Sequence, residues 1–93
     1  MFKVNEYFEG KVKSLGFNMK DGPATIGVMA KGEYEFGTSQ KEIITLTTGA
    51  MAVKLPGAQE WKKIKVNDSF EVAAHQKFLV RVEEDSSYVC LYR

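Results

Sequence analysis

The side chains that most often carry chemistry are scarce in this sequence. There is one histidine, His75, and one cysteine, Cys90. A cysteine-based zinc site needs several more such ligands. Carboxylates gather at Glu33 and Glu35 and again at residues 83–85, but neither group has the spacing of a cation-binding loop. We interpret both groups as solvated charges.

Nucleophilic catalysis has equally little support from motifs. Cys90 and His75 could meet in space, but Cys90 lies in an apolar, aromatic segment where nothing would lower the pKa of its thiol. We therefore expect a buried, unreactive thiol. The chain has no Gly-x-Ser-x-Gly elbow and no glycine-rich phosphate loop. Motifs alone indicate no activity.

The elements that must position these residues are β-strands. Apolar and polar side chains alternate with a period of two along most of the chain, which is typical of strands with one buried face. No stretch keeps a helical period. A helix could begin after Ser39 within residues 39–46, but the β-branched run Ile43-Ile44-Thr45 favours a strand. The alternating segments are residues 25–30, 43–47, 50–55, 64–66, 69–72, 78–83 and 88–93.

Turn-forming residues separate these segments at intervals of about 8–12 residues, the spacing of an all-β sandwich or barrel. The chain contains no linker, no repeat and no low-complexity tract, so residues 1–93 are predicted to form one domain. The turn positions are Asp21-Gly22-Pro23, Gly32, Gly49, Pro56-Gly57, Asn67-Asp68 and Asp85-Ser86-Ser87.

Composition restricts the partners of the chain. It has 93 residues and a net charge of +1, with 44% hydrophobic residues. A nucleic-acid-binding protein would carry a basic excess, and we interpret the cluster Lys62, Lys63 and Lys65 as the solvated face of a strand. No apolar run is long enough to span a membrane, and the N-terminus lacks a signal-peptide core. We expect no nucleic-acid or membrane partner and a cytoplasmic location.

The small size of the chain also bears on its assembly. A domain of this length buries a modest fraction of its unfolded surface, so its own stability is limited. Pairing with a second copy would bury more surface, and we therefore expect a homodimer.

Several stretches, spread over nearly the whole chain, together resemble one bacterial protein family. The stretches are Asn5-Glu6-Tyr7-Phe8, Gly10-Lys11-Val12-Lys13-Ser14, Gly27-Val28-Met29, Gly32-Glu33-Tyr34 with Phe36 and Thr38, Gly49, Leu55-Pro56, Trp61, and Ser87-Tyr88 with Cys90 and Tyr92. No fragment is specific alone, but the set and the matching length are similar to the small pyrimidine/purine nucleoside phosphorylases of the cupin superfamily. The resemblance implies a single-domain, cupin-like (jelly-roll) β-barrel.

The first cupin motif, His-x-His followed by Glu and Gly, can be laid on residues 36–49. Glu42 stands six residues before Gly49, as the motif requires, while Phe36 and Thr38 occupy the positions of its two histidines. A phenyl ring cannot coordinate a divalent ion. The resemblance therefore implies a pocket that works without metal.

The second cupin motif falls on residues 67–78. Asn67 and His75 stand at its two glycines, Ala73 at its proline, and Phe78 at its metal-binding histidine. Asn67 is a mild change because asparagine tolerates the left-handed backbone better than most residues. Three of the four usual metal ligands are thus replaced, and Glu42 alone remains.

These substitutions suit a nucleoside, and the resemblance implies a role for each residue. Phe36 and Phe78 would stack on the base, with Tyr34 as a further substrate contact. Thr38 and Glu42 would hydrogen-bond the ribose. Glu42 would also stabilise positive charge at the anomeric carbon, and His75 would donate a proton to the leaving base. Inorganic phosphate is the co-substrate, and no cofactor is expected.

Three classes of function stay open at this point. The leading one is a broad-specificity nucleoside phosphorylase. The second is a non-catalytic cupin that binds a nucleoside or sugar, and the third is a metal-dependent enzyme that uses Glu42 and His75. Simpler interpretations also stand beside the assigned roles: Phe36 and Phe78 as barrel core, His75 as a surface-turn residue, and Tyr88 and Tyr92 as packing residues of the core or of a subunit interface.

Overall fold

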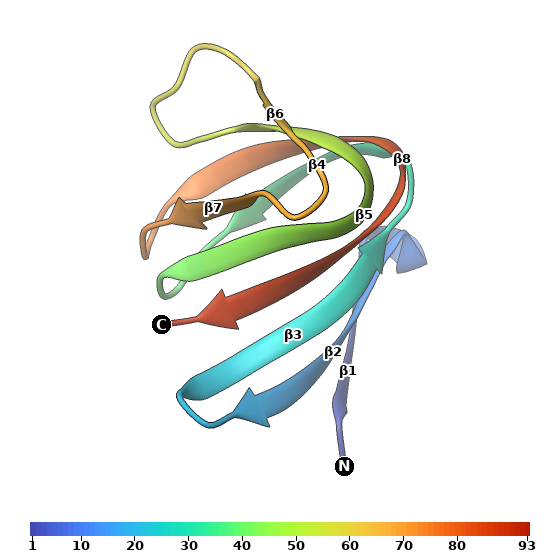
Figure 1. Ribbon diagram of the computed structural model, residues 1–93, viewed down its shortest axis with the longest axis vertical. Helices are drawn as coiled ribbons and strands as arrows, with labels where there is room; N and C mark the ends of the chain where they lie inside the picture. The colour runs from blue at the N-terminus through green and yellow to red at the C-terminus, as the bar shows by residue number, and fades with distance from the viewer.

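The computed structural model describes residues 1–93, and strands make up most of it (Figure 1). The prediction of an all-β fold is confirmed, including the strand that replaces a helix after residue 41. No helical segment has the length and apolarity of a membrane-spanning helix. The elements are β1 (Lys3–Tyr7), a 3-10 turn η1 (Phe8–Gly10), β2 (Val12–Met19), β3 (Gly22–Met29), β4 (Gly32–Gly37), β5 (Glu42–Lys54), β6 (Lys62–Ile64), β7 (Ser69–Val72) and β8 (Lys77–Tyr92).

The two longest strands, β5 and β8, pair with each other and belong to both layers of the fold (Figure 1). The beginning of β5 and the end of β8 continue into a large layer, β1-β2-β3-β8-β5-β7. The other halves of the same strands form a small layer, β4-β8-β5-β6. All pairs are antiparallel, and β1 and β4 do not pair with each other. The predicted barrel is therefore an open one.

A bend in β5 and β8 turns one layer onto the other. The register of this pair shifts between Leu46 and Met51, as β-bulges do where a sheet must curve. Gly49 has φ 100° there, and a Cβ at this position would overlap the Ser86 side chain. Ser86 is buried, and its hydroxyl accepts from the Ala50 amide at 3.1 Å. The predicted turns at Gly49 and Ser86 are thus bends within continuous strands, because the ladder persists on both sides.

The segment between β6 and β8 has the left-handed backbone at the two glycine positions of the second cupin motif. Asn67 has φ 76° and His75 has φ 61°, so both positions that the motif reserves for glycine are left-handed. The backbone of the motif is preserved although its glycines are replaced.

The hydrophobic core lies between the layers and is continuous. Fifteen buried residues form one cluster, and the buried side-chain polar atoms all have hydrogen-bond partners. The cluster consists of Val12, Met29, Tyr34, Ile44, Leu46, Met51, Val53, Ile64, Phe70, Val72, Phe78, Val80, Val82, Tyr88 and Cys90. Where the layers diverge, the core gives way to a cavity.

Candidate functional site

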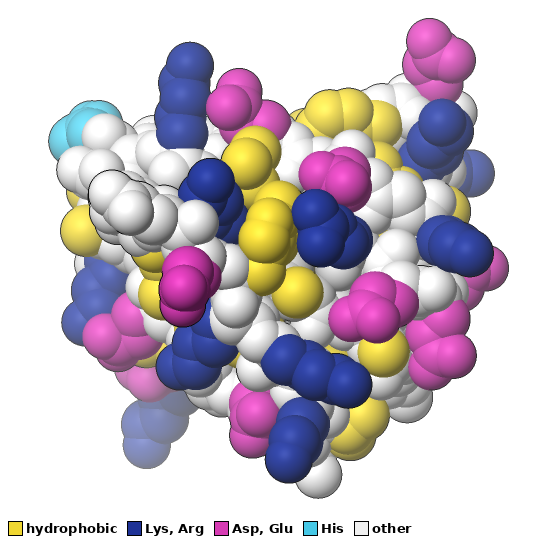
Figure 2. Space-filling model, turned by 90° about the horizontal axis from the view of Figure 1, so that it is seen from above, with side chains coloured by type: hydrophobic (Ala, Val, Ile, Leu, Met, Phe, Trp, Pro, Cys, Tyr) yellow, Lys and Arg dark blue, Asp and Glu magenta, His cyan; other side chains and the backbone are white.

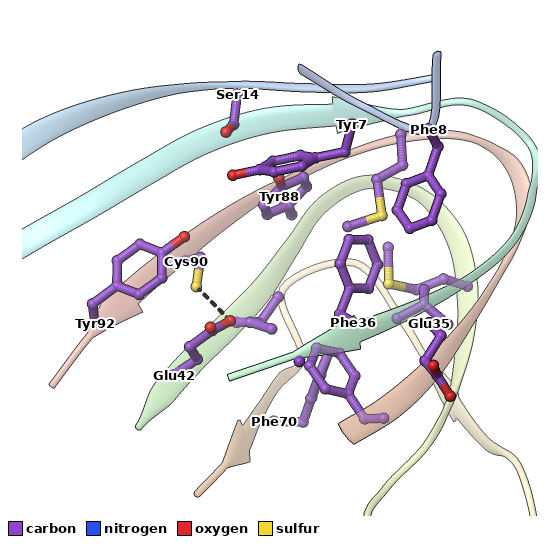
Figure 3. Close-up of a pocket in the computed structure, with 16 residues that line it drawn as sticks. Tyr7, Phe8, Ser14, Glu35, Phe36, Glu42, Phe70, Tyr88, Cys90 and Tyr92 are labelled. Carbon is purple, nitrogen blue, oxygen red and sulfur yellow. Dashed lines mark hydrogen bonds between the residues drawn. The ribbon is translucent and has the colours of Figure 1, made fainter. Parts of the chain in front are cut away.

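A cavity of about 420 Å³ opens between the two layers (Figure 3). This volume lies within the range of about 300–1,000 Å³ that is usual for small-molecule sites. The sixteen lining residues come from η1 and from every strand except β6, and twelve of the sixteen are hydrophobic. The lining consists of Tyr7, Phe8, Ser14, Met29, Glu35, Phe36, Gly37, Glu42, Ile44, Met51, Phe70, Phe78, Val80, Tyr88, Cys90 and Tyr92.

One end of the cavity is aromatic. Phe36 and Phe78 face each other across the β4–β8 pair, with ring centroids 5.7 Å apart. Phe70 lies 6.2 Å from Phe78, and Phe8 lies edge-on to Phe36 at 5.6 Å. The four side chains come from four different elements and all line the cavity. Figure 3 shows Phe8, Phe36 and Phe70 on the same side of it. Such rings offer apolar faces on which a flat heterocycle can stack.

Phe8 reaches this position through a strained backbone. Phe8 and Glu9 have φ of 53° and 58°, a conformation that costs a bulky residue about 1–2 kcal/mol. The turn they form carries Phe8 toward the free edge of β4, where its ring lies 4.9 Å from that of Tyr34. Residues in such conformations gather where function fixes a side chain. The strain brings an aromatic ring from the end of β1 to the cavity.

The other end of the cavity is polar, and Glu42 is its centre. Glu42 lies opposite Tyr92 in the β5–β8 ladder, and Cys90 lies opposite Ile44. The Cys90 thiol donates to Oε1 of Glu42 at 3.4 Å (Figure 3). The Tyr92 hydroxyl shares a hydrogen bond of 3.1 Å with Thr25. A carboxylate, a thiol and a phenol thus converge on one wall.

Tyr88 adds another hydroxyl to this end. Its side chain points into the cavity beside Ser14 of β2 and Tyr7 of β1 (Figure 3). Gly27 of β3 makes room for it, because a Cβ at that position would lie 2.8 Å from the Tyr88 hydroxyl and 2.8 Å from the Ser14 Cβ. The sequence therefore needs the smallest residue at Gly27 for the phenol to fit.

Burial governs the electrostatics of the polar end. It raises the pKa of Glu42 above the ordinary 4.5, while the hydrogen bond from Cys90 acts in the opposite direction. Burial also raises the pKa of Tyr88 to about 12. It raises the pKa values of the Cys90 thiol and the Tyr92 phenol well above their ordinary range. The phenols and the thiol are therefore neutral hydrogen-bond donors at physiological pH, and Glu42 is the group that can carry charge among them.

The residues predicted to hold substrate divide into two sets. Phe36, Phe78 and Glu42 line the cavity, at the positions that the cupin motifs give to metal ligands. No group of three His, Cys, Asp or Glu side chains converges anywhere in the chain in a way that could hold a metal ion. The donor set present at the cavity is a single carboxylate with hydroxyl and thiol neighbours, which does not fit the four-ligand metal centre of the cupin motifs.

Thr38 and Tyr34 lie outside the cavity lining and serve the fold. The Thr38 hydroxyl donates to the Ala73 carbonyl at 2.6 Å and accepts from the Gln76 amide at 3.0 Å, which fixes the turn before β8. The Tyr34 hydroxyl donates to the Ala30 carbonyl at 2.6 Å, and its ring belongs to the core. Both hydroxyls thus hydrogen-bond to backbone groups and do not line the cavity.

His75 is the clearest departure from the prediction. It sits in the exposed turn before β8, outside the cavity lining, with its amide donating to the Thr38 carbonyl at 3.0 Å. The side chain of this single histidine lies at the periphery of the molecule (cyan in Figure 2). Its left-handed backbone belongs to the exposed turn between β7 and β8. The structure therefore does not bring His75 together with Glu42, Phe36 and Phe78 at the cavity.

Several lining residues were not assigned to the site from the sequence. Tyr88, Cys90 and Tyr92 alternate along β8, so the sequence predicts that they share one face of the strand. It does not distinguish a role at the cavity from a packing role for the two tyrosines. The only local indication of a turn after Tyr7 and Phe8 is the nearby Gly10, because neither residue type favours a left-handed backbone.

Comparison with known proteins places this geometry in a family. The family model described as pyrimidine/purine nucleoside phosphorylase matches residues 2–92. A protein of that name from Pseudomonas aeruginosa (strain LESB58) is 58% identical over 93 residues and is covered completely, as is this chain. Another of that name, from Alcanivorax borkumensis, is 55% identical over 92 residues, which cover 99% of this chain and 98% of the relative.

Solved structures agree on the fold. A crystal structure of a protein of unknown function from Vibrio parahaemolyticus superposes with a TM-score of 0.96 at 40% identity, covering 100% of this chain and 99% of that one. A cupin-superfamily protein from Desulfitobacterium hafniense superposes with a TM-score of 0.72 at 12% identity, covering 97% and 81%. At that identity the likeness concerns the fold alone. It confirms the predicted cupin-like architecture.

Proposed function

The chain belongs to the pyrimidine/purine nucleoside phosphorylase family, and from this premise we propose that it is an enzyme that cleaves nucleosides with inorganic phosphate. The products are the free base and ribose 1-phosphate. The observation that carries the proposal is the two-ended cavity, which joins stacking rings to a buried carboxylate. A nucleoside has the same two parts, a flat base and a polyhydroxylated ring.

The base would occupy the aromatic end. The faces of Phe36 and Phe78 contact any heterocycle through stacking, which is worth about 1–3 kcal/mol per base and does not distinguish one base from another. Phe8 and Phe70 would complete the enclosure. Recognition through ring faces, with few polar groups at that end, supports a broad specificity for purines and pyrimidines.

The ribose would lie at the polar end, with its anomeric carbon toward Glu42. The bond from this carbon to the base nitrogen breaks, and its electron pair leaves with the base. An oxygen of hydrogen phosphate then forms the new bond to the same carbon, and the proton of hydrogen phosphate ends on the base. Positive charge develops on the sugar in between, and the Glu42 carboxylate would stabilise it electrostatically.

Neutral donors would orient the substrates around that charge. The Tyr88 and Tyr92 hydroxyls keep their protons because their pKa values are raised by burial, and they can donate to ribose or phosphate oxygens. No metal or organic cofactor enters this scheme. The single thiol, Cys90, is free and buried, which supports the proposal that the enzyme works in the reducing cytoplasm.

The test is the release of free base from a panel of purine and pyrimidine nucleosides, with and without phosphate and with EDTA present. We expect release that depends on phosphate, occurs with several nucleosides and is unaffected by the chelator. Binding without release, in a folded sample, would support the alternative of a non-catalytic nucleoside-binding cupin. Release only after a divalent metal is added would overturn the metal-free scheme.

A further inference from the structure

The large layer carries a row of residues that crosses four strands and ends inside the cavity. Asn5 of β1 lies opposite Ser14 of β2. Across β3, Gly27 lies between Ser14 and Tyr88 of β8. Tyr7 stands two residues after Asn5 on the same face of β1, and its side chain lines the cavity together with those of Ser14 and Tyr88. We call the side chains of Tyr7, Ser14 and Tyr88 the hydroxyl niche.

The hydrogen bonds along this row run in one direction, toward the cavity. The Asn5 side-chain amide donates to the Ser14 hydroxyl at 3.3 Å. Burial raises the pKa of Tyr88, whereas a side-chain hydrogen bond with Ser14 acts to lower it. A hydrogen bond lowers the pKa of a phenol when it is donated to the phenol oxygen, so Ser14 is the donor to Tyr88. The proton of the Tyr88 hydroxyl is therefore left to be donated into the cavity.

The hydroxyl niche is buried and fixed in place. Ser14 is 5% exposed and Tyr88 is 7% exposed. The missing side chain of Gly27 gives the Tyr88 hydroxyl its space beside Ser14. Tyr7 lies near enough for its charge to act on the pKa of Tyr88, and Figure 3 shows the three side chains together at the top of the cavity. Two phenol hydroxyls thus face one enclosed space.

The chemistry of the niche suits an oxyanion. Tyr88 keeps its proton at physiological pH because burial raises its pKa, so it offers a donor and no negative charge. None of the sixteen lining residues is Lys, Arg or His, so neutral donors have to hold any anion in the cavity. Phosphate oxygens accept such hydrogen bonds, which are about twice as strong as those between neutral groups. Ribose hydroxyls also need acceptors, and Glu42 supplies one away from the niche.

The position of the niche fits the displacement of a base. The rings of Phe36 and Phe70 come from β4 and β7, whereas β1, β2 and β8 carry the niche. Figure 3 shows the niche above these two rings, with Glu42 to the left. Glu42 is paired with Tyr92, four residues beyond Tyr88, which is roughly 13 Å along the strand. This separation leaves space for a pentose between the niche and the carboxylate. A nucleophile in the niche approaches the anomeric carbon from a side that the base does not occupy.

We propose that the hydroxyl niche binds inorganic phosphate, with Tyr7 and Tyr88 donating to its oxygens and with Asn5 and Ser14 orienting the Tyr88 donor. This assignment rests on the proposed function and adds the place of the co-substrate. A phosphate oxygen that the phenols leave free forms the bond to the anomeric carbon. The base departs with the electron pair of the broken bond, and the proton of hydrogen phosphate ends on the base. Tyr7 and Tyr88 are binding residues, and Asn5 and Ser14 are positioning residues.

The test compares the KM for phosphate with the KM for a nucleoside in hydroxyl-deletion variants. Tyr88→Phe removes one donor and keeps the ring, and Ser14→Ala removes the group that orients this donor. Ser69→Ala is the matched control, because Ser69 is an exposed serine that bonds Thr45 at 2.7 Å outside the cavity. We expect the KM for phosphate to rise at least tenfold in Tyr88→Phe, several-fold in Ser14→Ala and not in Ser69→Ala. The KM for the nucleoside should stay within about twofold, since hydrogen bonds to a charged ligand are the ones removed.

Circular dichroism confirms that each variant is folded before its kinetics are compared. A folded Tyr88→Phe variant with the wild-type KM for phosphate would overturn the proposal. A rise in the KM for the nucleoside alone would overturn it too, and would assign the niche to ribose. Asn5→Ala provides the test of positioning: its KM for phosphate should rise several-fold while its KM for the nucleoside stays constant, which a general loss of structure would not produce.

Two further measurements separate this site from its alternatives. Because the donors are neutral, the KM for phosphate should change less than about twofold between 0.02 and 0.2 M KCl, whereas a site built on lysine or arginine would weaken steeply as salt screens its charge. Such a steep loss would overturn the proposal. If the wild type cleaves no nucleoside, the proposed function fails, and equilibrium dialysis with radiolabelled phosphate decides the site alone. Phosphate binding that Tyr88→Phe abolishes would then support the niche, and no binding would overturn it.

Discussion

The two ends of the cavity differ both in chemistry and in the way they are built. The polar end stands on β5 and β8, which pair with each other at Glu42, Ile44 and Leu46 and are flanked by further strands on both sides. The aromatic end depends on β4, which pairs with β8 alone, and on the left-handed turn that carries Phe8. Glu42 is therefore fixed by the centre of the sheet, while Phe36 and Phe8 reach the cavity from its margins. This division teaches that one scaffold can hold a carboxylate between paired central strands and build an aromatic surface partly from its margins.

The largest expected effect lies at the polar end. Glu42→Gln removes the charge that faces the developing cation, and we expect kcat to fall about 100-fold, the scale of removing one electrostatic stabiliser. Nucleoside affinity, measured by equilibrium dialysis, should change little because the aromatic end is intact. Glu35→Gln is the matched control, since Glu35 is an exposed carboxylate at the cavity rim and should leave kcat unchanged. Full activity in Glu42→Gln would remove the carboxylate from the mechanism.

A smaller effect of the opposite kind is expected at the aromatic end. Phe36→Ala deletes one stacking face, and we expect KM to rise about tenfold for purine and pyrimidine nucleosides alike, with kcat nearly unchanged. Steady-state kinetics with inosine and uridine measures both parameters. Trp61→Ala, which removes an aromatic ring from the outward surface near Arg81, serves as the control. A loss confined to one class of base would show that the ring reads base identity.

A smaller effect again is expected at Cys90, whose thiol donates a hydrogen bond to Glu42 at the polar end of the cavity. Removing the thiol in Cys90→Ala takes away the hydrogen bond to Glu42, so the pKa of the carboxyl should rise further and kcat should fall about threefold at pH 7. Activity needs the ionised form, so it is lost as pH falls through the Glu42 pKa, and this acid limb should move to higher pH in Cys90→Ala. Cys90→Ser keeps a donor and should restore the wild-type profile. An acid limb that stays in place would show that the thiol does not act on Glu42.

The smallest effect concerns stability. Because the pKa of Glu42 is higher in the folded protein than in the unfolded chain, its stabilising contribution is present at low pH and lost as pH rises through the folded pKa. Glu42→Gln should therefore unfold at a higher temperature than wild type at pH 7, and the difference should shrink toward pH 4. Thermal denaturation followed by circular dichroism measures both. A variant less stable than wild type at pH 7 would contradict the assigned cost of burying this carboxylate.

The sequence was most informative where the spacing of the cupin motifs assigns a residue to a strand. Phe36, Phe78 and Glu42 were assigned in this way, and all three line the cavity. His75 and Thr38 lie outside the cavity lining for a common reason. His75 belongs to the turn before β8, and Thr38, which follows β4, hydrogen-bonds to the backbone of that turn, so backbone hydrogen bonds and a left-handed residue decide the direction of the side chains. Alternation carries no information about such a segment.

Two other features were beyond local patterns. The strands on either side of Gly49 were expected to be separate, because a glycine in a sequence looks the same at a turn and at a bend. Only the pairing of β5 with β8 over its whole length shows that the chain continues. The left-handed turn at Phe8 likewise depends on tertiary packing, since isolated phenylalanine avoids that conformation.

The most direct test of the two-ended cavity is a crystal structure of Glu42→Gln soaked with inosine, since the variant should bind a nucleoside without cleaving it. The account predicts the base between Phe36 and Phe78 and the anomeric carbon beside the side chain of residue 42. A nucleoside bound in the reverse orientation, with its base against Tyr88 and Tyr92, or bound outside the cavity, would contradict it.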